Sequence, residues 1–306
     1  MALVALGLLG VLAAAIGVSA CSSGGGGQAS PSSQTATQRF AAILGHQPTG
    51  LARTIAERGT LLVGEDPEFA PQSSVDGTGS WSGFDVDVAR AVAAQLGLKV
   101  EFLELDWARV PAALAADRYD VAISSMATDP APAGSLAFAA PYSYMTAQVV
   151  VRQGASPITT LAGLRGKTIG ASASTTFQQF LEATGGVGVA LYQSDADALP
   201  DIENGSLSGA MTADTTAATE RAAGAQISPT GGSGFYYQPQ AFAVRPGETD
   251  FVAVLNGALK AMRADGSLRA ASRRWYQGLD VSVRPAGVPG FSKALAMLKA
   301  GTYTPQ

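Results

Sequence analysis

Short apolar runs alternate along this chain with segments whose apolar residues recur every three to four positions. TLLVGE, which begins at Thr60, has the pattern of a buried strand. In residues 83–97 the apolar positions fall on one face of a helix, with Asp85 expected as the N-cap and Gly97 as the stop. The strand patterns LKVEFLEL and DVAIS follow, separated by a helical segment with Pro111 near its first turn. Strand–helix–strand alternation of this kind predicts an α/β sheet.

A second set of similar elements starts after the long apolar strand TAQVVVR. Its members are a turn and strand (LAGLRGKTIGASA), a helix (TTFQQFLEATG), a strand (GVALY), a helix broken by Pro200, a strand (GAMTA), a helix (DTTAATERAA), a strand (AFAVRPGE) and a long helical stretch that ends near residue 278. A short helical lead-in from Arg39 to Arg58 precedes the first set. The chain is therefore predicted to contain two α/β domains of similar plan.

The N-terminal segment, residues 2–20, is apolar or small without a charge and ends at Cys21. About 20 apolar residues can span a bilayer, but small residues at the end of such a run favour a cleavable segment. Val18-Ser19-Ala20-Cys21 resembles a bacterial lipobox, which implies a lipoprotein signal peptide at 1–21 and lipidation of Cys21. Residues 22–38, rich in Gly and Ser, are expected to form a flexible linker. No Lys or Arg precedes the apolar run, which leaves open a start codon further upstream.

Composition narrows the choice of function. The 306 residues are 47% hydrophobic and 14% charged, which is sufficient for more than one core. A net charge of −4 without a basic run argues against nucleic acid as a partner. One cysteine and one histidine, His46, exclude an intrachain disulfide and argue against a zinc site. No catalytic nucleophile, phosphate loop, metal site or cofactor site is predicted.

Polar and aromatic residues follow four of the predicted strands. Glu65 to Phe69 come after the first strand, Ser124 and Ser125 after DVAI, residues 174–176 before a helix, and Asp214 after GAMT. In open α/β sheets ligands bind beyond the carboxyl ends of the strands, and a helix N-terminus can hold an anion. A ligand site at these strand ends is therefore predicted.

Several longer stretches are similar to the bacterial extracellular solute-binding proteins of family 3, the amino-acid-binding components of ABC importers. They are ERGTLLVGEDPEFAP, GFDVDVARAVAAQLG, LDWARVPAALAADRYDVAISSM, FAAPYSYMTAQVVVR, LAGLRGKTIGASASTTFQQF and LNGALKAMRADGSLRAASRRWY, over roughly residues 54–278. The resemblance implies a two-lobed periplasmic-binding-protein-like fold of type II. It also implies hinge closure on an amino acid or related solute, without a covalent step, and delivery to a membrane permease.

The resemblance also sets the expected organisation and location. Lobe 1 would comprise 39–147 with 241–280, and lobe 2 would comprise 148–240, with AQVVVR and QAFAVR as crossover strands. Residues 281–306 form a C-terminal extension to which we assign no role. The expected partners are a small-molecule ligand, the permease and ATPase of an ABC transporter, and the membrane through a lipid anchor on the outer face of the cytoplasmic membrane. A monomer is expected.

Site residues are carried over from the family position by position. The aromatic residue that stacks on the ligand matches Phe69, and the aspartate just before it matches Asp66. The remaining matches are a pocket-lining residue (Trp107), the Ser/Thr pair at a strand end (Ser124 and Ser125), the threonine at a helix N-terminus (Thr176) and the aspartate for the ligand's α-ammonium (Asp214).

One family feature is missing. Pro132 stands where the family typically has the arginine that clamps the ligand's α-carboxylate, Ala127 replaces a usual hydroxyl, and Asp129 adds negative charge. Loss of such a charge-assisted bond costs on the order of 1.5–3 kcal/mol. We therefore predict a zwitterionic or cationic ligand, or one without a free α-carboxylate.

Three alternatives remain open at this point. The first is an enzyme on the same fold, dehydratase-like or glycan-cleaving, which needs an acid–base pair in the cleft. The second is a ligand-sensing module. The third is a degenerate binding module that has lost its ligand, which the missing arginine permits.

Overall fold

The computed structural model describes residues 34–106, 109–130, 136–229 and 234–304. The chain divides into two units, 1–34 and 35–306, and the described helices and strands belong to the second. The predicted signal peptide with Cys21, most of the linker, and residues Trp107 and Pro132 lie outside the described residues. Within the described ranges no helix is long and apolar enough to cross a membrane.

The first lobe is built on a five-stranded sheet. Its order is β5 (Lys99–Glu104), β1 (Thr60–Glu65), β6 (Val121–Ala122), β14 (Ala243–Val244) and β7 (Ala137–Phe138). β1 runs parallel to both β5 and β6, and β14 runs antiparallel to β6 and β7. The carboxyl ends of β1 and β6 therefore meet at one edge, which carries Glu65 and Ser124.

Six helices accompany this sheet. They are α1 (Ala36–Leu44), α2 (Gly50–Arg58), α3 (Phe84–Leu96), α4 (Val110–Ala115), α9 (Thr249–Ala264) and α10 (Ser267–Trp275). One apolar core unites α1, α2, α3, α9 and β1, and it reaches from Ala36 to Val281. A small antiparallel sheet, β2 (Glu68–Phe69), β3 (Ser73–Val75) and β4 (Trp81–Ser82), follows β1.

The second lobe contains a six-stranded sheet. Its order is β10 (Gly188–Tyr192), β9 (Thr168–Ser172), β11 (Gly209–Ala213), β8 (Ser143–Arg152) and β12 (Ile227–Pro229), with β13 (Tyr236–Gln240) also paired with β8. β9 is parallel to β10 and β11, whereas β8 is antiparallel to β11. The helical segments of this lobe are α5 (Leu161–Leu164), α6 (Thr176–Thr184), η3 (Ala196–Ala198), α7 (Leu199–Asn204), α8 (Asp214–Ala222) and α11 (Phe291–Lys299).

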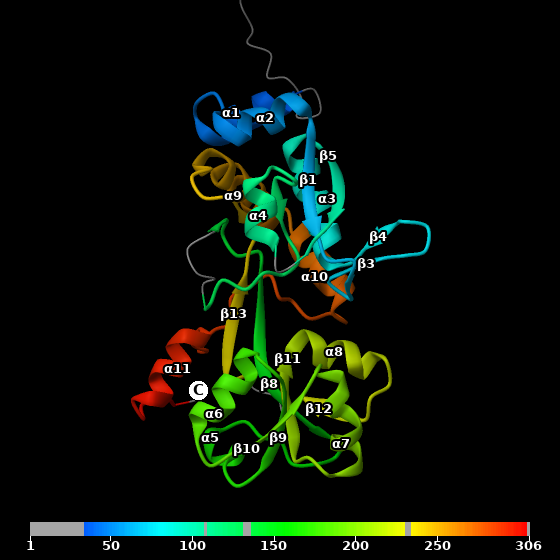
Figure 1. The fold of residues 1–306 in the computed structure, drawn as a ribbon, viewed down its shortest axis with the longest axis vertical. Helices are drawn as coiled ribbons and strands as arrows, with labels where there is room; N and C mark the ends of the chain where they lie inside the picture. Colours follow the sequence, from blue (N-terminus) through cyan, green and yellow to red (C-terminus); the bar gives the residue numbers. More distant parts are fainter. Residues whose placement is uncertain (1–33, 107–108, 131–135, 230–233, 305–306) are drawn as a thin grey trace, which may run out of the picture. The chain divides into compact units, whose positions relative to one another are not determined.

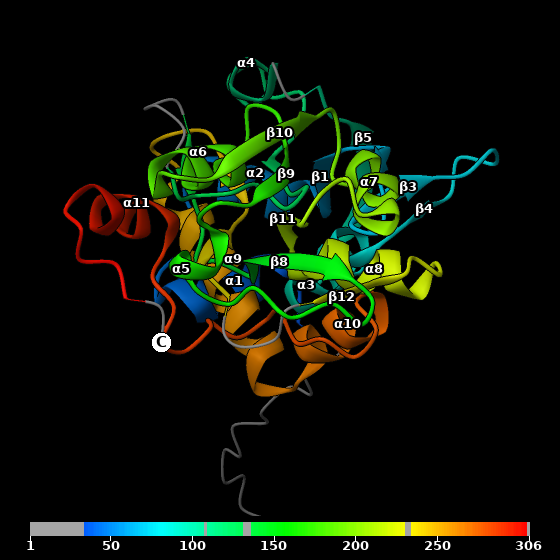
Figure 2. The ribbon, with the colours of Figure 1, turned by 90° about the horizontal axis from the view of Figure 1, so that it is seen from below.

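The chain passes between the two sheets at β8 and at β13, which lie side by side in antiparallel pairing (Figure 1). Ser143 pairs with Gln240 and Ala147 with Tyr236. This pairing lies at the start of β8, before most of the predicted segment AQVVVR (147–152). β13 ends at Gln240, the first residue of the predicted segment QAFAVR. A third passage leads from α10 to α11, which lies beside α6 of the second lobe (Figure 2). α11 also packs against β13.

The C-terminal residues complete the core of the second lobe. Phe291, Ala294 and Tyr303 belong to the same buried cluster as Phe180 and Tyr236. The Tyr303 hydroxyl also donates a hydrogen bond to the carbonyl of Phe235. Residues 281–304, to which the sequence analysis assigned no role, therefore contribute directly to folding.

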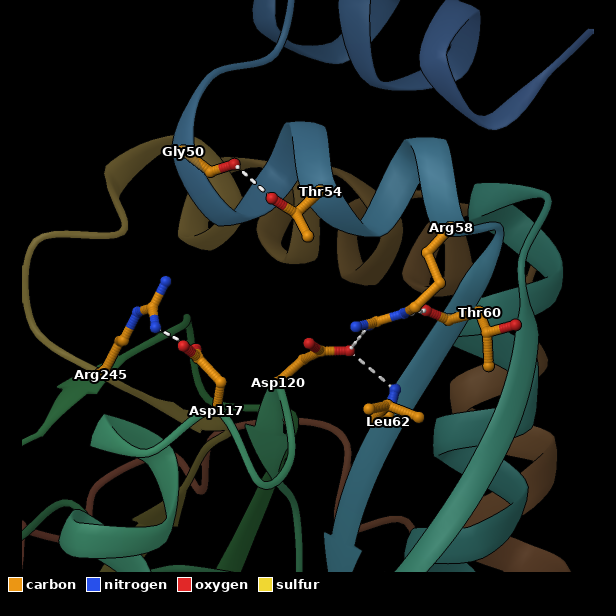
Figure 3. Close-up of polar contacts among 8 residues, drawn as sticks. All are labelled: Gly50, Thr54, Arg58, Thr60, Leu62, Asp117, Asp120 and Arg245. Carbon is orange, nitrogen blue, oxygen red and sulfur yellow. Dashed lines mark hydrogen bonds and ion pairs between the residues drawn. The ribbon is translucent and has the colours of Figure 1, made fainter.

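An ionic contact between the exposed Arg58 and the buried Asp120 fixes the start of β6 on β1 (Figure 3). The carboxylate of Asp120 accepts a hydrogen bond from the Arg58 guanidinium and another from the Leu62 backbone N–H, the latter at 2.8 Å. Arg58 also donates to the carbonyl of Thr60 at 2.9 Å. Burial raises the pKa of Asp120, whereas these donors act in the opposite direction.

Three local expectations were wrong. Asp85 does not cap α3, because Gly83 occupies the N-cap and Asp85 lies in the first turn with its side chain buried. A Cβ at residue 83 would lie 2.2 Å from the Gln72 carbonyl oxygen, so this position requires glycine. The lead-in before β1 is two helices rather than one, since α1 ends at Gly45 in the left-handed conformation. Pro200 does not break a helix but lies in the first turn of α7.

Candidate functional site

A cavity of about 470 Å³ is lined by residues of both lobes, and we call it the inter-lobe cavity. The first lobe contributes Phe69, Ala70 and Gln72, from β2 and the segment after it. The second lobe contributes Ser172, Thr175, Phe177, Asp195, Thr216 and Glu220, among others. Cavities of this size suit a small-molecule ligand.

The charge of the inter-lobe cavity is negative. Among the described residues that line it, Asp195 and Glu220 are the ionisable ones, and no Lys, Arg or His side chain takes part. Phe69 is 37% exposed and supplies an aromatic face. This lining suits a ligand that carries positive charge together with an apolar or planar part.

Asp195 is held by two hydroxyl groups at the end of the second sheet. Ser172, at the end of β9, and Thr212, in β11, each donate a hydrogen bond to one of its carboxylate oxygens. Burial raises the pKa of Asp195, while both hydroxyl donors lower it. The hydroxyls fix the position of the carboxylate, and each of its oxygens can accept a further hydrogen bond.

The first turn of α6 borders the inter-lobe cavity. Thr175 is the N-cap, and its hydroxyl accepts from the backbone N–H of Gln178 and donates to the carbonyl of Ser172 at 2.6 Å. The predicted residue Thr176 lies between the lining residues Thr175 and Phe177. Its hydroxyl donates to Gln238 and accepts from Tyr236, both at 3.0 Å, so this side chain is engaged with β13.

The predicted residues of the first lobe have different surroundings. Phe69 lines the inter-lobe cavity, whereas Asp66 accepts a hydrogen bond from the backbone N–H of Glu68 at 2.8 Å in the turn after β1. Ser124 and Ser125 are buried at the end of β6 and are not part of the cavity lining. The structure thus brings Phe69 near the first turn of α6 and leaves the two serines beneath the surface.

Asp214 lines a second cavity of about 620 Å³, together with Thr146, Arg221 and Tyr276. Its carboxylate accepts from the backbone N–H groups of Thr146 at 3.0 Å and Thr215 at 2.9 Å. Burial raises the pKa of Asp214 to about 6. The two cavities lie along different faces of α8, since Thr216 and Glu220 line the first and Ala218 and Arg221 line the second.

Asp129, which was expected from the sequence to add negative charge near the ligand, does not line the inter-lobe cavity. The Ser292 hydroxyl and backbone N–H both donate to its carboxylate, so Asp129 stabilises the start of α11. Its negative charge is compensated by the first turn of that helix.

Sequence reasoning assigned no role to Asp195, and it named Glu65 only among the residues that follow the first strand and Asp85 only as an N-cap. The position of Asp195 in the loop after β10 was the signal that would have identified it. Glu65 directly follows an apolar run, which is the position where a strand end meets a site.

The sequence is similar to a known protein family and to individual proteins of known ligand. The sequence profile of the "Bacterial extracellular solute-binding proteins, family 3" matches residues 61–278. The L-cystine-binding protein TcyJ of Escherichia coli (strain K12) is 30% identical over 237 residues, which cover 76% of this chain and 88% of that protein. The ABC transporter arginine-binding protein 1 of the same organism is 28% identical over 227 residues, covering 70% and 89% respectively.

Two solved structures are also similar. The L-cystine solute receptor of Neisseria gonorrhoeae, in its unliganded open conformation, matches with a TM-score of 0.67 and 26% identity, covering 77% of this chain and all of that one (100%). An ancestral cationic amino acid solute-binding protein matches with a TM-score of 0.64 and 28% identity, covering 73% and 98%.

Proposed function

The chain belongs to the bacterial extracellular solute-binding proteins of family 3, and on that premise we propose that it captures a zwitterionic or cationic amino acid for an ABC importer. The observation that carries the proposal is the lining of the inter-lobe cavity, which contains two carboxylates and, within the described residues, no basic side chain. Relatives named for L-cystine and arginine bind ligands of these two charge classes.

Binding in this proposal takes place between the lobes. The ligand's positive group pairs with Asp195 or Glu220, its flat or apolar part lies against Phe69, and its carboxylate meets the N-terminal turn of α6. β8 and β13, as the paired passages between the sheets, are the elements about which the lobes would close. The closed form then presents the ligand to a membrane permease.

Isothermal titration calorimetry of the purified chain with L-arginine, L-cystine and L-glutamate tests the ligand class. We expect micromolar or tighter binding of L-arginine or L-cystine and much weaker binding of L-glutamate. Binding of L-glutamate tighter than about 1 µM, a binding free energy beyond about −8 kcal/mol, would contradict the proposal. A bound ligand stabilises the folded state. If no compound of a wider metabolite panel raises the melting temperature, a degenerate binding module is favoured.

An enzyme on the same fold would change its ligand. The amino acid can be incubated with the protein for a long time and then analysed by mass spectrometry. Unaltered amino acid indicates binding and argues against a dehydratase or glycan-cleaving reaction. New product masses would favour catalysis and would direct attention to Asp195 and Glu220 as the acids of the cavity.

We also propose that Cys21 carries a lipid anchor. The proposal is supported by the apolar run before it and by the Gly/Ser-rich stretch after it, which is long enough to separate the folded lobes from a membrane surface. Metabolic labelling with a fatty acid should mark the full chain, and Cys21→Ala should abolish the label and shift the protein to the soluble fraction. A chain that stays unlabelled before substitution would refute the anchor without affecting the ligand proposal.

A further inference from the structure

Two consecutive serines on the first lobe, Ser124 and Ser125, adopt a backbone conformation that disfavours residues other than glycine. Their φ angles are +45° and +48°, both in the left-handed region. Such conformations persist only where the surrounding structure holds them, and they gather at functional sites. We call this pair of residues the serine turn. The side chains packed beneath it hold its conformation.

Glu65 holds the first of the two serines. The Ser124 N–H donates to Oε2 of Glu65 at 3.3 Å, and the Asp66 N–H donates to Oε1 of Glu65 at 3.2 Å. The Asp66 N–H also lies 3.3 Å from the Ser124 hydroxyl oxygen. Glu65 is 0% exposed. Its carboxyl group thus ties the end of β6 to the end of β1, where the predicted ligand residues stand.

Tyr142 and Asp85 hold the second serine. The Ser125 N–H donates to the Tyr142 hydroxyl oxygen at 2.9 Å, and that hydroxyl donates to Oδ1 of Asp85 at 2.7 Å. Both side chains are 0% exposed. The Ser125 hydroxyl, by contrast, has no hydrogen-bond partner within the described residues. These contacts fix the backbone of the turn, whereas the Ser125 hydroxyl lies buried in this conformation.

The carboxyl groups of Glu65 and Asp85 are buried, and neither forms an ion pair within the described part of the chain. Burial raises the pKa of both, that of Asp85 to about 7, and the charge of Asp85 further raises that of Glu65. A neutral carboxyl can accept and donate hydrogen bonds without leaving a charge in the core. The acids thus suit a role based on hydrogen bonding rather than on charge.

We propose that Glu65, Asp85 and Tyr142 are positioning residues that hold the serine turn in its ligand-binding conformation from beneath. The inference rests on the proposed function together with the family-based prediction that Ser124 and Ser125 contact the ligand, since neither serine lines the inter-lobe cavity in this structure. Ligand affinity then depends on three side chains that do not line the inter-lobe cavity.

The substitution Tyr142→Phe tests this, with Tyr119→Phe as its matched control. Both tyrosines are almost fully buried in the first lobe, but the Tyr119 hydroxyl has no hydrogen-bond partner in the described structure. In titrations with L-arginine and L-cystine we expect Tyr142→Phe to weaken binding about tenfold or more, the effect of one lost hydrogen bond and one unpaired amide. Tyr119→Phe should bind within about twofold of the wild type.

Amide hydrogen exchange gives a readout that needs no ligand. We expect the peptide that contains Ser124 and Ser125 to exchange faster in Tyr142→Phe and at the wild-type rate in Tyr119→Phe. Unchanged exchange in Tyr142→Phe overturns the inference, as does faster exchange with unaltered affinity. If the wild type binds neither probe, the proposed ligand class fails, and exchange alone decides whether the network holds the turn.

Substitution of Glu65 provides a second test if Tyr142→Phe does not fold. Glu65→Gln keeps one oxygen that can accept from Ser124 N–H but turns an NH2 group toward Asp66 N–H, so we expect a smaller loss of affinity and of exchange protection than in Glu65→Ala. Glu65→Ala removes that acceptor, and we expect faster exchange with affinity reduced about tenfold. Equal affinity of the two variants, both folded by circular dichroism, overturns the positioning role.

Discussion

The backbone N–H of Ser292 lies 3.2 Å from both carboxylate oxygens of Asp129, and the Ser292 hydroxyl donates to the same group. Asp129 follows the serine turn, whereas Ser292 stands in the first turn of α11. This contact joins the segment after β6 to the C-terminal helix and removes Asp129 from the set of charges available to a ligand.

We expect Asp129→Ala to lower the free energy of unfolding by about 0.5–2 kcal/mol, because it removes the acceptor at the helix N-terminus. Urea denaturation followed by circular dichroism measures the change. Glu57→Ala, on the exposed face of α2, is the control and should stay within about 0.5 kcal/mol of the wild type. A change in ligand selectivity in Asp129→Ala would instead favour the original sequence-based view of this residue.

Asp120→Ala should destabilise the first lobe by about 1–3 kcal/mol, because it leaves the Leu62 N–H without its acceptor and Arg58 without its counter-ion. The contact is drawn in Figure 3. Thr54→Ala, on the same helix as Arg58, removes only an exposed hydroxyl bonded to the Gly50 carbonyl at 3.3 Å. That variant should unfold within about 0.5 kcal/mol of the wild type, and an equal loss in both would refute the specific role of Asp120.

The buried acids predict a characteristic dependence of stability on pH. Asp85 has a folded-state pKa of about 7, above its unfolded value near 4, so the folded state binds more protons between these values. The contribution of Asp85 to the free energy of unfolding should therefore be highest below about pH 4. It should decrease as the pH rises to about 7, by up to roughly 1.4 kcal/mol per pH unit.

Asp85→Asn should reduce this slope, because the amide cannot ionise and still accepts a hydrogen bond from Tyr142. The other titratable groups that face Asp85 are Glu65, Tyr142 and Tyr276. Of these, Glu65 contributes in the same direction, since its pKa is also raised. Urea titrations at pH 4, 5.5 and 7 measure the slope, and an identical slope in wild type and Asp85→Asn would show that folding does not raise the pKa of Asp85.

Asp195→Asn should weaken binding of a cationic ligand by roughly one to two orders of magnitude, the loss expected for a charge-assisted hydrogen bond. Titration with L-arginine measures the effect. Glu182→Gln is the matched control, because Glu182 is an exposed acid on α6 that accepts from Gln178 at 2.8 Å and does not line the inter-lobe cavity. Equal affinities of Asp195→Asn and wild type would place the ligand's positive group elsewhere, with Asp214 as the next residue to substitute.

The order of strands and helices could be predicted from sequence because it depends on local patterns. The helix that ends at Gly97 and the strand TLLVGE were both identified, since apolar spacing and a left-handed stop are properties of neighbouring residues. The start of that helix was not, because the N-cap depends on a close approach between Gly83 and Gln72 that only the folded chain brings about.

The residues of the site were harder to predict from sequence, because their roles also depend on contacts that form only in the folded chain. From sequence alone, a carboxylate that faces a ligand cannot be told apart from one in a buried network. The buried position of Glu65 and the contact of Asp129 with α11 were therefore not predicted. Their surroundings come from tyrosine, serine and helix residues that are distant along the chain. Ligand contacts at Asp66, Ser124, Ser125, Thr176 and Asp214, and at Trp107 outside the described residues, therefore stay predictions that binding measurements must decide.

The closing helix of the chain has a consequence for synthesis. The core of the first lobe draws on residues from Ala36 to Val281, and that of the second on residues from Ala147 to Tyr303. The first core therefore cannot be completed before Val281 has left the ribosome or a translocation pore, nor the second before Tyr303 has done so. A product that lacks residues 291–303 would leave Phe180 and Tyr236 without Tyr303 and Phe291, and it would be prone to aggregation and degradation.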